Sequence, residues 1–139
     1  MEKRLLQTAI IVAALVPILA GLAGVVWGPA MAGSIVGAAF DSHFRYLSGL
    51  LIGVGAAYWS LAPSIEREGQ RLFMLTLIVV VGGFFRALGM LIDGPPGVGM
   101  SLALALELIV APALYVWQTR IARLTQGPPA SMDATTPWR

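Results

Sequence analysis

Residues 72–119 have the sequence LFMLTLIVVVGGFFRALGMLIDGPPGVGMSLALALELIVAPALYVWQT, in which two apolar runs flank one short turn. Each run is about 20 residues long, which is the length that an α-helix needs to cross a hydrocarbon core of ~30 Å. The turn at residues 93–99 contains prolines, which cannot continue a helix, and glycines, which adopt positive φ without strain. The stretch therefore predicts two antiparallel transmembrane helices at about residues 72–92 and 100–119.

Two further apolar runs of membrane length precede this hairpin, at about residues 5–27 and 44–62. The basic residues before the first run resemble the start of a signal peptide, but the run is longer than the apolar part of such a peptide, so we expect a transmembrane helix. We therefore predict an all-α fold, an integral membrane four-helix bundle with up-down connectivity, formed by residues 1–123 as a single domain. Residues 124–139 are rich in Pro, Ser and Thr and are expected to form a flexible cytoplasmic tail.

The composition agrees with this fold and leaves most soluble functions without support. Of the 139 residues, 58% are hydrophobic and 12% are charged, whereas soluble domains are about half apolar and a quarter charged. The chain has no cysteine and a single histidine, so we expect no disulfide, no metal site and no cofactor. Its basic residues are scattered at the ends of the apolar runs, which argues against a nucleic-acid partner.

The distribution of Lys and Arg predicts which end of the bundle faces the cytoplasm. One end would hold both termini, the connection at residues 63–71 and these basic residues: Lys3, Arg4, Arg67, Arg71, Arg120, Arg123 and Arg139. The opposite end would hold only Arg45 and Arg86. Because cytoplasmic segments are enriched in Lys and Arg, we predict cytoplasmic N- and C-termini and a multi-pass protein of the bacterial inner membrane.

The connection at residues 28–43 is unusually apolar for a loop. One interpretation is a short helical or irregular segment that rests on the outer interface of the membrane. The other interpretation is a lid over a cavity at the outer end of the bundle.

Small residues predict where the helices approach each other, because helix association in lipid depends on close packing. Gly21 and Gly24 in the first helix suit such a contact, as do Ser48 and the pattern Gly49-x-x-x-Gly53 in the second. We expect these small residues to suit a tight bundle.

Two ionisable residues lie inside predicted membrane helices, where an uncompensated charge costs from ~3 to more than ~10 kcal/mol. Arg86 lies about six residues, or ~9 Å, below the outer end of its helix, and Glu107 lies about seven residues, or ~10 Å, below the outer end of the next. A tight turn joins the two helices, so the two side chains share one depth. We therefore predict an ion pair between Arg86 and Glu107.

Further polar residues near the outer end could join this pair: Asp41 and His43 just before the second helix, Arg45 at its mouth, and Asp93 at the end of the third helix. One interpretation is a buried polar network that fixes the register of the helices. A second is a ligand site in which Arg45 and Arg86 bind an anionic or amphiphilic headgroup. A third is a proton or ion relay through Glu107. Catalysis ranks last, because the sequence shows no nucleophile with a partnered base.

Three stretches together carry a family resemblance: Phe44-Arg45-Tyr46-Leu47-Ser48-Gly49-Leu50, the segment from Arg86 to Pro95, and Leu106-Glu107-Leu108. They resemble an uncharacterised family of small bacterial four-helix membrane proteins, named only as a domain of unknown function and similar to the wider DoxX-like group. The resemblance covers roughly residues 5–122 and implies an inner-membrane four-helix fold with no settled activity. It also implies that Arg45, Arg86, Asp93 and Glu107 are the polar positions of the pattern. The lack of cysteine and of a metal motif argues against the redox role of some DoxX-like relatives.

These features predict a binding or accessory protein rather than an enzyme. The bundle would hold a lipid-like or quinone-like ligand, or would dock onto a larger membrane complex or a second copy of itself. The alternative is a small proton- or ion-coupled transporter that uses Glu107. Pairing with Arg86 argues against this alternative, because a carrier needs a carboxylate that is free to gain and lose a proton.

Overall fold

A computed structural model describes residues 1–32, 37–94 and 96–126, and every regular element in these ranges is helical. In chain order the elements are α1 (Glu2–Trp27), the 3₁₀ segment η1 (Gly28–Ala32), α2 (Ala38–Leu61), the 3₁₀ segment η2 (Ala62–Arg67), α3 (Gly69–Asp93), α4 (Val98–Ala105), the π-helical segment η3 (Leu106–Val110) and α5 (Ala111–Gln126). Segments α4, η3 and α5 follow one another without a break. The described residues thus contain four helices that are long and apolar enough to cross a membrane, which confirms the predicted all-α class.

Two boundaries differ from the sequence-based expectation. Helix α2 begins at Ala38 instead of residue 44, because the carbonyl of Gly37 accepts hydrogen bonds from the N–H groups of Phe40 and Asp41 and starts the helix there. Asp41 and His43 therefore lie within the first turns of α2 rather than before it. At the other end of the chain, α5 continues to Gln126, so the first residues of the predicted tail are helical. Residues 33–36 of the connection and residues 127–139 of the tail lie outside the described residues.

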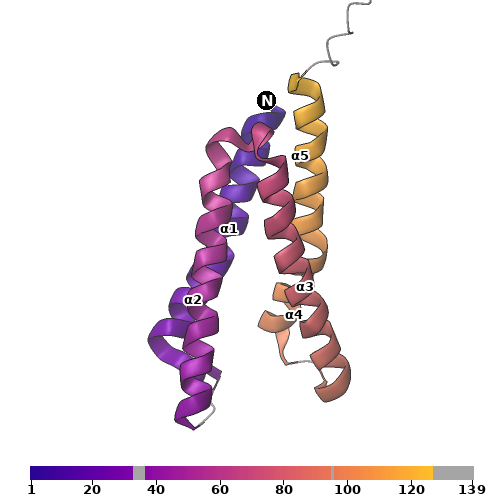
Figure 1. Cartoon of the computed structure of the whole chain (residues 1–139). Coiled ribbons are helices and arrows are strands. Elements are labelled where there is room, and N and C mark those ends of the chain that lie inside the picture. Colours follow the sequence, from indigo (N-terminus) through magenta and orange to yellow (C-terminus); the bar gives the residue numbers. More distant parts are fainter. Residues whose placement is uncertain (33–36, 95, 127–139) are drawn as a thin grey trace, which may run out of the picture.

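The helices form two hairpins that meet at one end of the molecule and diverge toward the other (Figure 1). One hairpin consists of α1 and α2, and the other consists of α3 followed by α4, η3 and α5. We call the end where the hairpins meet the closed end; it holds the N-terminus, η2 and the last turn of α5. The opposite end, which holds η1 and the turn between α3 and α4, is the open end.

The buried core lies at the closed end, and both hairpins contribute to it. Its apolar residues are Leu6, Ile10 and Ala14 of α1, Tyr58 and Leu61 of α2, Ala62 and Ile65 of η2, Leu72 of α3, and Leu114 and Ile121 of α5. Polar contacts fix η2 onto α1 beside this core. Gln7 Nε2 donates to the carbonyl of Ala62 at 2.9 Å, and Lys3 Nζ lies 2.9 Å from Glu66 Oε1.

Glycines let α1 and α2 pack closely along their length. A Cβ atom on Gly55 would lie 2.6 Å from Cγ1 of Ile18, and a Cβ atom on Gly21 or Gly24 would meet atoms of Ser48. Gly21 and Gly24 are therefore points of close approach between helices, as expected for small residues.

Gly49 and Gly53 make no such close approach within the described residues. Both glycines are exposed, and a Cβ atom on either would have no other described atom within 4 Å. The helical period explains this difference, because at 100° per residue Ser48 and Gly55 fall on one face of α2. Gly49 and Gly53 are turned about 100° or more from that face and point away from α1.

Candidate functional site

An ion pair between Arg86 and Glu107 joins α3 to η3 in the part of the second hairpin nearer the open end. Arg86 Nε donates to Glu107 Oε2 and Nη2 donates to Oε1, each at 2.9 Å. The two side chains are 30% and 17% exposed, so they are partly shielded by their neighbours. Such a two-point contact between a guanidinium and a carboxylate is among the strongest side-chain pairings. The contact that was predicted from matched depth is confirmed.

Gly83 allows Glu107 to approach α3. It lies one turn before Arg86, and a Cβ atom on it would lie 2.9 Å from both Cβ of Glu107 and Cδ2 of Leu108. Any larger residue would push the two helices apart. The ion pair therefore depends on a glycine in the helix that carries the arginine.

The backbone around Glu107 is π-helical rather than α-helical, over residues Leu106–Val110, and the N–H of Ala111 bonds the carbonyl of Leu106. Pro112 gives the physical reason. A proline has no N–H to donate, and in a regular α-helix its ring would clash with the carbonyl four residues earlier. A widened turn before the proline relieves this conflict and sets the direction of the Glu107 side chain.

Arg86 has a third polar contact, which is weaker than the other two. Its Nη1 lies 2.9 Å from Sδ of Met100, at the start of the next helix. A thioether sulfur is a poor hydrogen-bond acceptor. An oxygen atom from a ligand could therefore replace Met100 at this nitrogen while the bonds to Glu107 remain.

Arg45 has its own partners in the other hairpin. Its Nε donates to Asp41 Oδ2 at 2.8 Å and its Nη2 donates to Asp41 Oδ1 at 3.2 Å, one turn earlier in α2. Its Nη1 donates to the backbone carbonyl of Val25. Carbonyls in the last turn of a helix have no partner within that helix, so Arg45 caps α1 and joins its end to α2. Gly28, at φ 58°, lets the chain turn beside the guanidinium, where a Cβ atom would lie 2.6 Å from Nη2 of Arg45.

The structure thus divides the predicted cluster between the two diverging hairpins (Figure 1). Arg86 and Glu107 form one pair on the second hairpin, and Arg45 and Asp41 form another on the first. Each arginine is compensated by a carboxylate of its own hairpin. The role of these residues as a ligand site or as a structural network stays a prediction.

His43 and Asp93 join neither pair within the described residues. His43 is exposed and stacks on Tyr46, with ring centroids 6.3 Å apart. Asp93 is exposed as the last residue of α3. In residues 1–32, 37–94 and 96–126, no three His, Cys, Asp or Glu side chains gather closely enough to hold a metal ion.

A second group of polar contacts, at the closed end, was not expected from the sequence. Gln118 is 1% exposed, and its Nε2 donates to the carbonyl of Ile65 at 3.0 Å. The hydroxyl groups of Tyr58 and Thr76 lie 3.3 Å apart and are buried. The first contact joins α5 to η2, and the second crosses between the hairpins. The signal in the sequence was an amide within an apolar run, because buried polar groups are kept where they find a partner.

A family model described as "Domain of unknown function (DUF4345)" matches residues 5–118 of the chain. No curated protein and no solved structure matches the chain. The predicted resemblance to an uncharacterised family is therefore confirmed. The relation to the DoxX-like group and the bacterial origin stay predictions.

Proposed function

This chain belongs to the DUF4345 family, a domain family of unknown function, and we propose that it binds a lipid-like or quinone-like molecule between its two hairpins at the open end. It would act as a binding or accessory protein of the membrane, alone, with a second copy of itself or within a larger complex. The four membrane-length helices support a location in a lipid bilayer.

The observation that carries this proposal is the uneven packing of the two hairpins. Both contribute to one buried core at the closed end, and from there they diverge toward the open end (Figure 1). The helices carry large exposed apolar side chains in their diverging parts. These surfaces suit contact with an apolar molecule from the bilayer. A bound tail would then cover exposed apolar side chains toward the open end, among which are Trp27, Ile92 and Leu102.

The Arg86 side chain supports a polar contact for the same molecule. Among the described residues its Nη1 contacts the sulfur of Met100 alone, whereas its other two donor groups bond Glu107. A quinone carbonyl, or an ester or phosphate oxygen of a lipid, is a better acceptor than a thioether. This arrangement replaces the simpler idea of one headgroup clamped by Arg45 and Arg86, because Arg45 is already held by Asp41 and by the end of α1.

The test is mass spectrometry of small molecules extracted from the protein after purification in a mild detergent. We expect a defined lipid or quinone with the wild-type protein and a large loss of it from the double variant Arg86→Met/Glu107→Leu. The double variant Glu68→Gln/Arg71→Gln is the control, because it removes an ion pair at the closed end. The proposal fails if the wild-type extract holds only bulk lipid, or if the two double variants retain the same amount.

We also propose that the closed end faces the cytoplasm, in a bacterial inner membrane. The basic residues of the described chain support this orientation, because only Arg45 and Arg86 lie away from the closed end. The chain has no cysteine of its own, so single cysteines can be placed at Ser64 and at Gly97. A membrane-impermeant maleimide should reach Gly97→Cys in intact cells and Ser64→Cys only in inverted vesicles. Labelling of Ser64→Cys in intact cells would reverse the orientation.

One observation favours the alternative of a small proton- or ion-coupled transporter. Glu107 lies in a π-helical turn, and such turns are frequent at functional sites. Against it stands the two-point bond to Arg86, which occupies both carboxylate oxygens. Proton flux into liposomes that contain the purified protein, lost in Glu107→Gln and kept in Glu68→Gln, would favour the transporter.

A further inference from the structure

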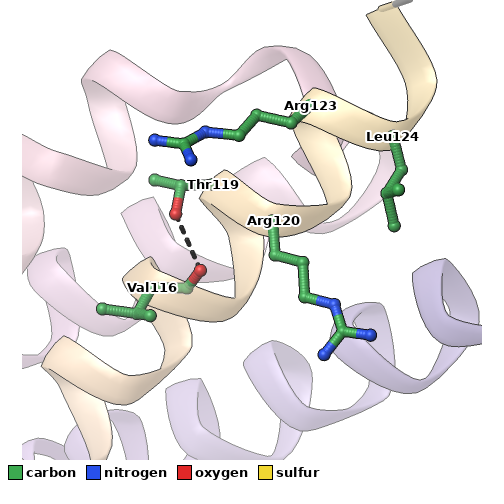
Figure 2. Close-up of a pocket in the computed structure, with 5 residues that line it drawn as sticks. All are labelled: Val116, Thr119, Arg120, Arg123 and Leu124. Carbon is green, nitrogen blue, oxygen red and sulfur yellow. Dashed lines mark hydrogen bonds between the residues drawn. The ribbon is translucent and has the colours of Figure 1, made fainter.

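The closed end carries a groove on α5 that has no part in the site proposed at the open end. Five residues line it: Val116, Thr119, Arg120, Arg123 and Leu124. Figure 2 shows Arg120 and Arg123 leaving the helix about one turn apart. Arg123 extends over Thr119, and Arg120 extends away from Thr119, toward α1. Val116 and Leu124, which are 64% and 69% exposed, form its apolar ends.

The two arginines are held only weakly by the described protein. Arg120 reaches Glu2 through a single contact of 3.4 Å, and the two side chains are 69% and 49% exposed. Exposed ion pairs of this kind contribute little to stability, so another anion can compete for the guanidinium. Arg123 is exposed and forms no ion pair with any other residue in the described ranges. Both groups are therefore available, unlike the guanidinium of Arg45, which is held by Asp41 and by the carbonyl of Val25.

The position of the groove along its helix corresponds to the headgroup layer of a membrane. The span Val98–Thr125 has 28 residues, which is about 42 Å of helix, whereas the hydrocarbon core is ~30 Å thick. With Val98 at one edge of the core, residues beyond about position 118 reach the opposite headgroup layer. Arg120 and Arg123 then lie at the depth of lipid phosphates, and Val116 lies one turn deeper, at the edge of the hydrocarbon.

We propose that this groove binds the headgroup of an anionic phospholipid from the leaflet at the closed end. The exposed side chains of Arg120 and Arg123 flank the groove and would turn toward the bound phosphate to donate hydrogen bonds to its oxygens, for which the planar guanidinium is well suited. Val116 contacts the beginning of an acyl chain. The net charge at this end attracts anionic lipids, and the two-arginine groove gives them a defined place.

The test uses the whole protein in detergent, with native mass spectrometry to count bound lipids. The probes are phosphatidylglycerol, which is anionic, and phosphatidylcholine with the same acyl chains, which is zwitterionic. We expect the wild-type protein to retain several-fold more phosphatidylglycerol than phosphatidylcholine. The double variant Arg120→Gln/Arg123→Gln should weaken the binding of phosphatidylglycerol roughly 25-fold, or about fivefold for each arginine. The control Arg4→Gln/Arg67→Gln removes the same charge from exposed positions at the same end and should keep the preference.

Three results would overturn the proposal. Equal retention of the two lipids by the wild-type protein would do so, and this measurement depends on no variant. An equal loss in the two double variants would assign the preference to net charge instead of the groove. Displacement of phosphatidylglycerol by inorganic phosphate at millimolar concentration would show a site for free anions and not for a lipid.

Discussion

Arg45 and Arg86 lie on different hairpins, both away from the closed end, and their charges are compensated in different ways. Arg45 bonds a carboxylate one turn away in its own helix and a carbonyl at the end of α1, beside a contact built on glycines. Arg86 bonds a carboxylate that lies 21 residues away in sequence, on another helix. The first hairpin is thus held mainly by packing. The second hairpin, away from the core, combines a close contact at Gly83 with an ion pair between its helices, so equal chemical changes should have unequal effects on the two.

The largest effect is expected for Glu107→Gln. This change leaves Arg86 without a counter-charge, and breaking one half of a buried pair costs about 3–5 kcal/mol in soluble proteins. The variant should unfold at a clearly lower temperature in detergent. The double variant Arg86→Met/Glu107→Leu should recover most of the loss, because well-packed apolar residues can equal a buried pair. A Tm of Glu107→Gln equal to that of the wild type would remove the contrast between the hairpins and would strengthen the transporter alternative.

A smaller loss, of about 1–3 kcal/mol, is expected for Gly83→Ala. The added methyl group would overlap with Glu107 and Leu108, so α3 and η3 must move apart and the ion pair must lengthen. Gly82→Ala is the matched control, because a Cβ atom on Gly82 has no other described atom within 4 Å. Thermal unfolding in detergent should separate the two variants. An equal loss in both would assign the effect to helix propensity rather than to the contact with Glu107.

The sequence predicts the helices and the Arg86–Glu107 contact because both follow from fixed quantities. The rise per residue sets the depth of each side chain, and a tight turn makes consecutive helices neighbours. Depth alone does not give the direction in which a side chain points around its helix. For this reason depth could not show that Arg45 and Arg86 belong to separate pairs on different hairpins. The spacing of four residues between Asp41 and Arg45 does predict their pairing, but only when the helix begins before Asp41.

The divergence of the hairpins has no simple signal in the sequence. Membrane helices are apolar on all sides, so their composition does not show which faces meet a neighbour and which meet lipid. Gly49 and Gly53 illustrate this difficulty, because their spacing suits a helix contact and yet they lie on an exposed face. Pro112 predicts a disturbance of the turn that precedes it but not the form that this takes, because Pro17 lies within α1, which is α-helical throughout.

A still smaller loss of stability is expected for Asp41→Asn. The side chains of Arg45 and Asp41 are 41% and 37% exposed, and Arg45 keeps its bond to the carbonyl of Val25 when the carboxylate is lost. The Tm in detergent should fall by much less than it does in Glu107→Gln. If Tm falls by the same amount in the two variants, the pair in the first hairpin stabilises the protein as much as the pair in the second. The difference between the hairpins would then disappear.

The smallest effect is expected for Gly53→Ala, and it sharpens the account of the first hairpin. A Cβ atom on Gly53 meets no other described atom within 4 Å, and alanine favours a helix over glycine by roughly 0.5–1 kcal/mol, so the Tm should stay the same or rise slightly. Gly55→Ala, two positions later in α2, would place its methyl group 2.6 Å from Cγ1 of Ile18 and should lower the Tm. Both variants make the same replacement in the same helix, so the helix propensities cancel and the difference in Tm measures the contact with α1. Equal Tm values would mean that close packing does not hold α1 against α2, and the contrast between a packed hairpin and an ion-paired one would then have no basis.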